Sequence, residues 1–297
     1  MSDTVCAIVT AYYPDKSLLT NIARLEEQVS WIIITDNTPC TDNAELFLSF
    51  SKVIYRANKV NLGLSKAFNN ILKLEKVKES GYILFLDQDS LIPVDLINKL
   101  IFDYNELLKE SIAVGCIGPV YYEKNADKLM IPKIKHKLLP HIYRVDAIIT
   151  SSMLTTYDAL SQIDFWNEQI FLDLADWDLC WRFNSIGLRC CLTQNVVLQH
   201  KLGVSVKQIG VFSVKEGSPI REYYQTRDCL KLLSKKYTPL IYKIRFFLML
   251  TIRPIIHILV LPDKYLRMKY IFFGIIDFFR SVNGPYDLRN KEQGRKI

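Results

Sequence analysis

The chain has 297 residues, of which 49% are hydrophobic and 12% aromatic, and this composition excludes a disordered protein. Its length is sufficient for one large α/β domain with a smaller appendage. Seven cysteines, an odd number with no CxxC pair, indicate reduced and mostly buried thiols and argue against a disulfide framework or a zinc site. The first residues lack the basic and apolar segments of a signal peptide, so we expect a cytoplasmic protein.

The net charge of +7 is distributed unevenly along the chain. Residues Lys231 to Ile297 contain 14 Lys and Arg against 4 Asp and Glu, whereas the 230 residues before them contain 24 against 27. A near-neutral body with a strongly basic end predicts an acidic partner for that end alone. We do not expect a nucleic-acid partner.

Strand-like and helix-like segments alternate over the first 120 residues. Short apolar runs predict buried strands at Val5–Thr10, Trp31–Thr35, Val53–Tyr55, Tyr82–Leu86 and Ala113–Ile117. Apolar residues at helical spacing predict helices between them, around Leu18 and Leu25, Leu64 and Leu72, and Leu96 and Leu108. This alternation predicts an α/β fold, with a mostly parallel sheet flanked by helices on both faces.

Polar residues follow these strands at the ends where open α/β sheets bind ligands. Thr10, Ala11 and Tyr12 end the first strand, Asp36-Asn37 follows the second, and Asp87-Gln88-Asp89 follows the fourth. The chain has neither a GxGxxG fingerprint nor a GxxxxGK[ST] P-loop. A nicotinamide-type dinucleotide site and a P-loop nucleotide site are therefore not indicated.

Asp87 and Asp89 place two carboxylates at the end of a buried strand, with only Gln88 between them. Such a pair can hold a hard divalent cation while leaving positions open for phosphate oxygens. This chemistry suits an enzyme whose substrate leaves as a nucleotide diphosphate. A capped turn is the alternative, because Asp and Ser also begin loops and Pro93 follows.

Asp176 begins a second informative segment, which runs to Ile186 and ends at Gly187. Its apolar residues recur at helical spacing and Gly187 suits a C-cap, so Asp176 is predicted at or beside a helix N-terminus. A positioned, ionised aspartate near a metal–diphosphate site can accept a proton from an incoming hydroxyl. In the alternative, Asp173, Asp176 and Asp178 are ordinary acidic residues of a helix start.

The second half of the chain contains two segments of different character. Residues 121–145 are polar and irregular and are predicted to form a loop over the site. Ile241–Leu261 is rich in Ile, Leu and Phe, but its three Lys and Arg residues and Pro254 argue against a membrane-spanning helix. We expect a domain over residues 1–233, and over 234–297 a basic amphipathic helical extension that lies on an anionic membrane. A helical subdomain with a solvated basic face is the alternative.

With these residues identified, the chain resembles the inverting family 2 glycosyltransferases, which have the GT-A fold. More narrowly, it is similar to the bacterial rhamnosyltransferases of O-antigen and capsular polysaccharide synthesis. The resemblance covers about residues 5–233. Six motifs in order carry it: Asp36-Asn37, Asn61 to Asn69 (N-x-G-x-x-x-A-x-N), Asp87-Gln88-Asp89-Ser90 (DxD), Phe171 to Arg182, Gln199 to Gly203 (H-x-x-G), and Tyr223-Tyr224 with Arg227 (Y-Y-x-x-R).

The resemblance implies roles for particular residues. It implies Asp176 as the catalytic base, and Asp87 and Asp89, with His200 as a further ligand, for Mg²⁺ or Mn²⁺. The implied donor-binding residues are Thr10, Ala11, Tyr12, Asp36, Asn61, Lys66, Asp87 and Gln88. The implied acceptor-side or auxiliary residues are Ser152, Trp177, Asp178, Arg182 and Arg227. A structural role for His200, and solvated surface positions for Arg182 and Arg227, are the alternatives.

Two positions depart from the family pattern. Ala175-Asp176 stands where relatives have Glu-Asp or Val-Asp, which leaves Asp176 as the single residue in the base position. Ser151-Ser152 stands where many relatives have Ser-Gly, which predicts a narrower acceptor pocket.

The resemblance implies metal-dependent, inverting transfer of L-rhamnose from dTDP-β-L-rhamnose to a hydroxyl of a lipid-linked or polysaccharide acceptor. We expect peripheral attachment to the inner face of the cell membrane; formation of a homodimer is left open. One alternative is a relative that uses UDP-galactose, UDP-glucose or UDP-galactofuranose. A catalytically silent membrane adaptor is a second. A sugar-nucleotide pyrophosphorylase is disfavoured, because no Gly-rich phosphate loop follows the first strand.

Overall fold

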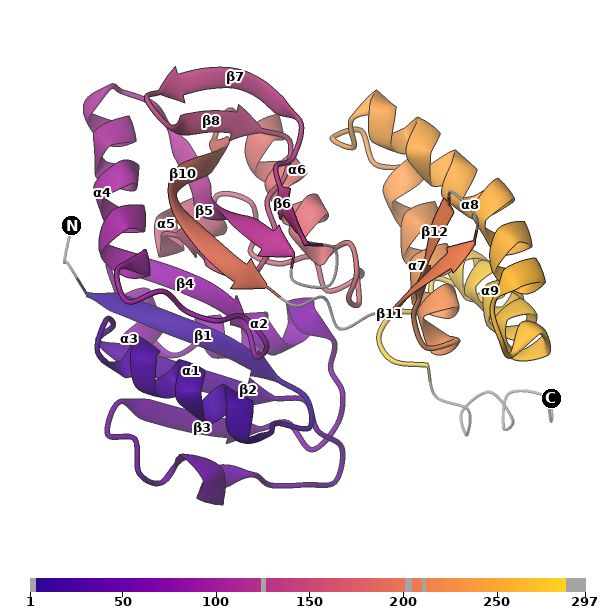
Figure 1. The fold of residues 1–297 in the computed structure, drawn as a ribbon, viewed down its shortest axis with the longest axis horizontal. Helices are drawn as coiled ribbons and strands as arrows, with labels where there is room; N and C mark the ends of the chain where they lie inside the picture. The colour runs from indigo at the N-terminus through magenta and orange to yellow at the C-terminus, as the bar shows by residue number, and fades with distance from the viewer. Residues whose placement is uncertain (1–3, 124–126, 201–204, 210–211, 287–297) are drawn as a thin grey trace.

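The computed structural model describes residues 4–286, except residues 124–126, 201–204 and 210–211 (Figure 1). The body of the chain is one mixed sheet covered by helices on both faces. Its strands follow the order β3-β2-β1-β4-β9-β5-β10-β8-β7, and β6 pairs with β5. The predicted α/β architecture is confirmed.

The parallel part of the sheet contains the strands that the apolar runs predicted. The bounds are β1 Val5–Ala11, β2 Trp31–Asp36, β3 Val53–Ala57 and β4 Tyr82–Asp87, followed by β5 Val114–Glu123 and β10 Arg189–His200. β1 pairs in parallel with β2 and β4, β2 with β3, and β5 with β10. The short strand β9, Met153–Thr155, lies antiparallel between β4 and β5, so the sheet is mixed.

Residues 121–145 are not a loop, which corrects the expectation from the sequence. β5 continues to Glu123, and the segment then forms β6 Lys128–Met130, β7 Ile134–Leu139 and β8 Ile142–Val145. β7 forms one edge of the sheet, and Lys135, His136 and Lys137 on it are exposed. Charged side chains protect an exposed strand edge from pairing with other chains, so the polar composition that suggested a loop belongs to an edge strand.

Two apolar cores lie on opposite faces of the sheet, because successive residues of a strand point to opposite sides. Cys6 and Ile8 of β1 belong to the core that α2 Leu64–Leu72, α5 Tyr157–Ser161 and α6 Ala175–Ser185 cover. Ala7 and Val9 belong to the other core, which α1 Lys16–Glu26 and α4 Leu96–Lys109 cover. The short helices η1 Ala44–Phe47 and α3 Glu75–Lys78 complete this region.

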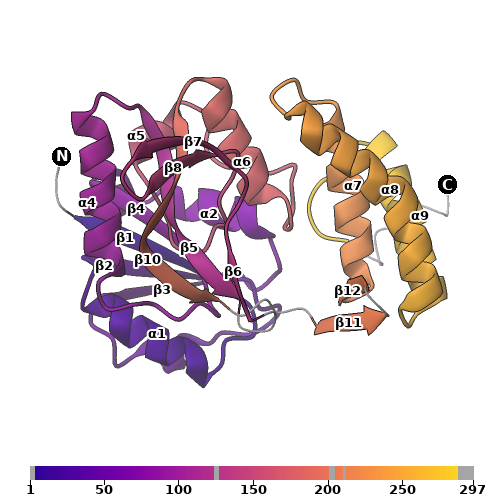
Figure 2. The same ribbon diagram turned by 45° about the horizontal axis from the view of Figure 1, so that its top comes forward.

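The C-terminal region is a separate group of helices beside the body (Figure 2). It begins with the hairpin β11 Ser205–Ile209 and β12 Phe212–Glu216, and continues with α7 Ile220–Leu233, α8 Leu240–Val260 and α9 Lys264–Phe279. Buried charges join the three helices: Glu222 of α7 accepts hydrogen bonds from His257 of α8 at 2.6 Å and from Arg267 of α9 at 3.2 Å.

The expected boundary after residue 233 falls at the end of α7. By its packing, however, α7 belongs with the helical group: Gly274 of α9 approaches its backbone so closely that an added Cβ would lie 2.8 Å from the Tyr223 carbonyl oxygen. α8 also contacts the body, because Phe246 is buried against Trp177 and Trp181 of α6. Within the described residues, no helix has both the length and the low charge needed to cross a membrane.

Candidate active site

The first and fourth strands are joined at their carboxyl ends by the side chain of Gln88. Its Oε1 accepts from the backbone N–H of Tyr12 at 2.8 Å, and its Nε2 donates to the Tyr12 carbonyl at 3.1 Å. Thr10 Oγ1 donates to the Leu86 carbonyl at 3.5 Å. Of the predicted donor residues, Thr10, Ala11, Tyr12 and Gln88 therefore lie together at one edge of the sheet.

Asp87 and Asp89 flank Gln88 at this edge. Asp87 is half-buried and Asp89 is exposed. Burial, and next the negative charge of Asp89, raise the pKa of Asp87 to about 7. Two neighbouring carboxylates that repel each other suit a hard divalent cation. The ion's positive charge would offset both the repulsion and the cost of burying a negative charge. The backbone N–H of Leu91 donates to the Gln199 carbonyl at 3.0 Å, which brings the end of β10 beside this loop.

Asp36, predicted as a donor-binding residue, is bound by its own loop and by β3. The carboxylate is fully buried and accepts from Thr38, Asn43 and Tyr55, and these hydrogen bonds lower its pKa although burial acts in the opposite direction. It therefore organises the loop after β2 and has no exposed surface for a nucleotide. The sequence could not show this, because the partners come from three separate positions.

Asn37 and Asn61 shape the neighbouring loop before α2. Asn37 donates to the Gly63 carbonyl at 3.1 Å and accepts from the backbone N–H of Leu62, while Asn61 accepts from that of Gly63 at 3.0 Å. Lys66, on the first turn of α2, is exposed. The motif thus fixes a loop at the same edge of the sheet.

Gly63 brings this loop against the segment that leads to Asp176. Gly63 has φ 76°, and a Cβ there would lie 2.5 Å from the Phe171 carbonyl oxygen. That oxygen accepts from the backbone N–H of Leu64 at 2.8 Å, at the start of α2. Only glycine satisfies both the positive φ and the close approach.

Asp176 lies in the first turn of α6, as predicted, and is half-buried. Burial raises its pKa well above the usual range, and the acidic neighbours Cys180, Asp87 and Asp173 add to the rise. Asp87, 89 residues earlier in the chain, is thus among the groups whose charge acts on Asp176. Asp173 is tied to Arg221 and Gln225 of α7, which leaves Asp176 as the better candidate for proton transfer.

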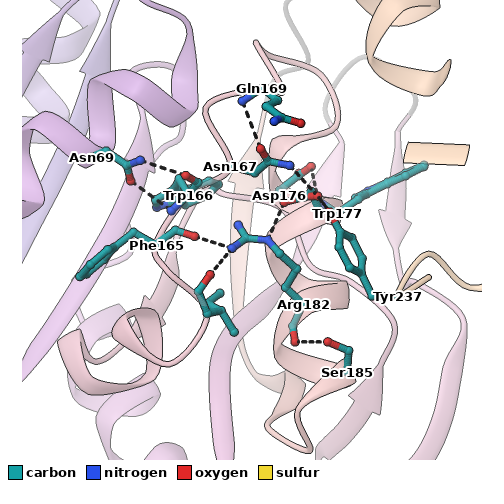
Figure 3. A network of polar contacts seen from close by, with 12 residues as sticks. Asn69, Phe165, Trp166, Asn167, Gln169, Asp176, Trp177, Arg182, Ser185 and Tyr237 are labelled. Atoms are coloured by element: carbon teal, nitrogen blue, oxygen red, sulfur yellow. Dashed lines mark hydrogen bonds and ion pairs between the residues drawn. The ribbon is translucent and has the colours of Figure 1, made fainter. Parts of the chain in front are cut away.

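Asp178 and Arg182, predicted as auxiliary residues of the acceptor side, bind each other inside the molecule. Figure 3 shows Arg182 among its partners. Asp178 is fully buried and accepts from Arg182 Nε at 2.7 Å, Tyr237 at 2.6 Å and Asn167 at 3.2 Å. Arg182 Nη1 also donates to the Ile163 and Phe165 carbonyls. Their network fastens α6 to the loop before it and to the segment before α8.

Trp177 is turned toward α8. Its ring lies 5.2 Å from that of Tyr242 and 5.0 Å from the guanidinium carbon of Arg245. Ser152 is fully buried with φ 68°, a conformation that favours the glycine of many relatives. The side chain of His200, the last residue of β10, lies outside the described part of the structure, as does the segment up to Gly203.

Arg227 is buried, so the alternative of a solvated surface position is wrong for it. Its side chain is inaccessible to solvent and bonds to Asp228 at 2.8 Å, to the Tyr223 hydroxyl at 3.2 Å and to the Gly284 carbonyl at 2.8 Å. It connects α7 to the segment after α9.

Comparisons with known proteins agree with this arrangement. Residues 6–158, just over half of the chain, match the family described as glycosyl transferase family 2. The chain belongs to glycosyl transferase family 2. This glycosyltransferase is 26% identical over 296 residues to a dTDP-rhamnosyl transferase, RfbF, of Shigella flexneri, covering 96% of this chain and 98% of that protein.

The fold of this glycosyltransferase is similar to those of solved GT-A enzymes. TarS of S. aureus, residues 1–349 in complex with UDP-GlcNAc, matches with a TM-score of 0.59 and 14% identity, over 94% of this chain and 81% of that one. GalNAc-T7 with UDP, GalNAc and Mn²⁺ matches with a TM-score of 0.54 and 12% identity, over 82% of this chain. The match spans 54% of the GalNAc-T7 chain.

Asp228 of this glycosyltransferase is a site-related residue that the sequence analysis missed. Its Oδ2 accepts from the backbone N–H of Phe171 at 2.8 Å, and the rings of Phe171 and Tyr224 stack at 4.2 Å. The residue directly follows the Y-Y-x-x-R motif, which is the only signal the sequence offered. Its partner is 57 residues away, so no local pattern could reveal the contact.

Proposed function

We propose that this glycosyltransferase transfers L-rhamnose from dTDP-β-L-rhamnose to a hydroxyl group of a saccharide acceptor, with inversion at the anomeric carbon. The observation that carries transfer is that the segment leading to Asp176 packs against the loop at Gly63, at the sheet edge where Asp87 ends β4. The charge of Asp87 also contributes to the raised pKa of Asp176. Likeness to a dTDP-rhamnosyl transferase along almost the whole chain supports the donor.

Asp87 and Asp89 would hold Mg²⁺ or Mn²⁺, with His200 proposed as a further ligand. The ion, when bound, supplies positive charge that neutralises the leaving nucleotide diphosphate. The structure of GalNAc-T7 with UDP and Mn²⁺ supports the use of a divalent cation in general. Thr10, Tyr12, Asn61 and Lys66 are proposed to contact the nucleotide sugar from the neighbouring loops.

Asp176 is proposed to take the proton of the acceptor hydroxyl. That oxygen forms a bond to the anomeric carbon as the bond from this carbon to the diphosphate oxygen breaks. One displacement inverts the configuration, so a β-L-linked donor gives an α-L-linkage. The nucleotide diphosphate leaves with the electron pair of the broken bond.

The acceptor is proposed to be a lipid-linked saccharide, reached from the inner face of the cell membrane. The outer surface of α8 carries large exposed apolar side chains, among them Leu240, Ile244, Phe247 and Leu259. Lys243, Arg245 and Arg253 lie on the same helix. An apolar face with basic flanks is the composition that binds an anionic membrane surface.

Thermal unfolding with a panel of nucleotide sugars and Mn²⁺ tests the donor. A ligand at 100 times its Kd stabilises the folded state by about 2.7 kcal/mol, so dTDP-β-L-rhamnose should raise Tm by several degrees. UDP-galactose, UDP-glucose and UDP-galactofuranose should not. A shift with one of these donors alone would replace the rhamnosyl assignment. The absence of any shift would favour a silent adaptor.

Flotation with phosphatidylglycerol vesicles tests the membrane surface. The full chain should float, and Phe247→Glu should float at least about tenfold less, because it puts a charge in the apolar face. Leu48→Glu is the matched control, since Leu48 is exposed on the body away from α8. Equal flotation of the two variants would contradict binding through α8.

A further inference from the structure

A cavity of about 520 Å³ lies where α8 begins, outside the candidate active site. Arg144 of β8, Trp181 and Asn184 of α6, and Lys236 and Lys243 around the start of α8 line it. The cavity therefore lies between the body and α8, the helix that carries the exposed apolar side chains. None of the residues predicted for the donor or metal lines it.

Three polar atoms of the lining residues have no hydrogen-bond partner among the described residues. They are Arg144 Nε, Trp181 Nε1 and Asn184 Oδ1. The Trp181 side chain is only 1% exposed, so water does not readily substitute for a partner. Buried polar groups are almost always bonded, so each exception needs an explanation, and a bound ligand is one. Two N–H donors suit an anion, and the amide oxygen suits a hydroxyl group.

The charges around the cavity also favour an anion. Arg144, Lys236 and Lys243 bring three positive charges, and the lone carboxylate, that of Asp146, is paired with Lys135 at 2.9 Å. Pro239, Leu240 and Lys243, at the start of α8, line the cavity, and α8 is a helix of 21 residues. The first N–H groups of a helix lack intrahelical partners and carry partial positive charge, which attracts phosphate groups.

The surface beside the cavity identifies the source of the phosphate. Leu240 and Ile241, on the first turn of α8, are 74% and 55% exposed, and Phe247, two turns further on, is 62% exposed. A free phosphate compound would gain nothing from these side chains, whereas the acyl chains of a lipid would cover them.

We propose that this cavity binds the phosphate of an anionic glycerophospholipid headgroup, with Arg144, Lys236 and Lys243 around the phosphate and Asn184 Oδ1 toward a glycerol hydroxyl. The proposal rests on the membrane docking proposed above and gives it a specific site. It also explains why Arg144 of the body, 96 residues before the start of α8, lines a cavity beside this helix.

Indole N–H signals in ¹⁵N–¹H spectra give the first test. The chain has four tryptophans, and Trp181→Phe assigns the relevant signal. Glycerol 1-phosphate should shift the Trp181 signal saturably, leave that of Trp31 unchanged, and lose its effect in Arg144→Gln. No saturable shift would overturn the anion site.

Vesicle binding gives the second test, with phosphatidylglycerol vesicles. Arg144→Gln should weaken binding at least tenfold, roughly the worth of a hydrogen bond to a charged group. Lys137→Gln removes an exposed cation of the neighbouring strand β7, and should weaken binding by no more than about fivefold.

Together the two tests distinguish a lipid headgroup from a free phosphate compound, and they distinguish failure of the anion site from failure of the membrane docking. A glycerol 1-phosphate shift together with wild-type vesicle binding by Arg144→Gln would assign the cavity to a free phosphate compound and overturn the lipid. If the unmodified protein does not bind vesicles, the membrane docking fails and the lipid with it. The indole titration then still decides whether the cavity binds an anion.

Discussion

Asp228 and Phe171 connect the C-terminal helices to the candidate active site. Asp228 Oδ2 accepts from the backbone N–H of Phe171 at 2.8 Å, and the Phe171 carbonyl accepts from the first N–H of α2. One peptide segment thus links α7, the donor-side loop at Gly63 and the approach to Asp176. The helical group therefore contributes to the position of the segment that precedes Asp176.

Asp228→Asn should lower both stability and activity. It removes the charge that balances buried Arg227, and breaking a buried ion pair costs about 3 kcal/mol of unfolding free energy. We expect kcat to fall more than the KM for the donor changes, since the segment before Asp176 loses its anchor. Denaturant unfolding and steady-state kinetics measure the two effects. Asp158→Asn, at an exposed acid of α5, is the control; a kcat equal in both variants would refute the positioning role.

Asp89→Ala should abolish metal-dependent transfer while leaving the fold intact, because Asp89 is exposed and its proposed work is to hold the cation. Loss of a metal's charge stabilisation amounts to several kcal/mol, or about 10³-fold in rate. EDTA should have the same effect on the unmodified enzyme. Asp95→Ala, six residues further on, should keep its activity. Full turnover by folded Asp89→Ala would disprove the metal site.

Asp176→Asn should reduce kcat by about 10² or more, the usual worth of general-base catalysis, with donor binding retained. Burial and acidic neighbours raise the pKa of Asp176, and a base works only when deprotonated. Activity should therefore rise with pH along a limb that lies above the ordinary Asp value of 3.8. Asp173→Asn is the matched comparison. If it proves the more damaging change to kcat, the base has been assigned to the wrong residue.

Glu222 should make the helical group sensitive to acid. Burial alone would raise its pKa, but the hydrogen bond from His257 and the charges of Arg253, His257 and Arg267 bring it below the usual 4.5. A carboxyl group whose pKa is lower in the folded state stabilises the fold above pH 4.5, and this contribution is lost as pH falls through the folded pKa.

Glu222→Gln should therefore lower the free energy of unfolding at pH 7 by about 3 kcal/mol, and with it the Tm. Below pH 4.5 the Tm of this variant should fall less steeply with pH than that of the unmodified protein. Thermal unfolding across pH measures both. Glu110→Gln, at an exposed acid after α4, should follow the unmodified protein. An acid transition of Glu222→Gln as steep as that of the unmodified protein would exclude this cause.

Local sequence patterns located the main elements of the site. A continuous apolar run predicted the strand that ends at Asp87, and apolar residues at helical spacing predicted that Asp176 lies at or beside a helix start. Because ligands bind beyond the carboxyl ends of the strands in open α/β sheets, the loops after these strands were expected on one side of the sheet. These features depend on neighbouring residues, so the sequence by itself determined them.

Only the tertiary structure decided which polar side chains are internal. Asp36, Asp178 and Arg227 had been expected at the donor or acceptor, yet each is buried among partners from other elements. The edge strands within residues 121–145 and the packing of α7 on α9 were likewise invisible. The physical reason is that a charged side chain is buried and paired by groups that the fold brings together from distant parts of the sequence. A charge that loses its water in this way must find a partner, and the local sequence does not show which one.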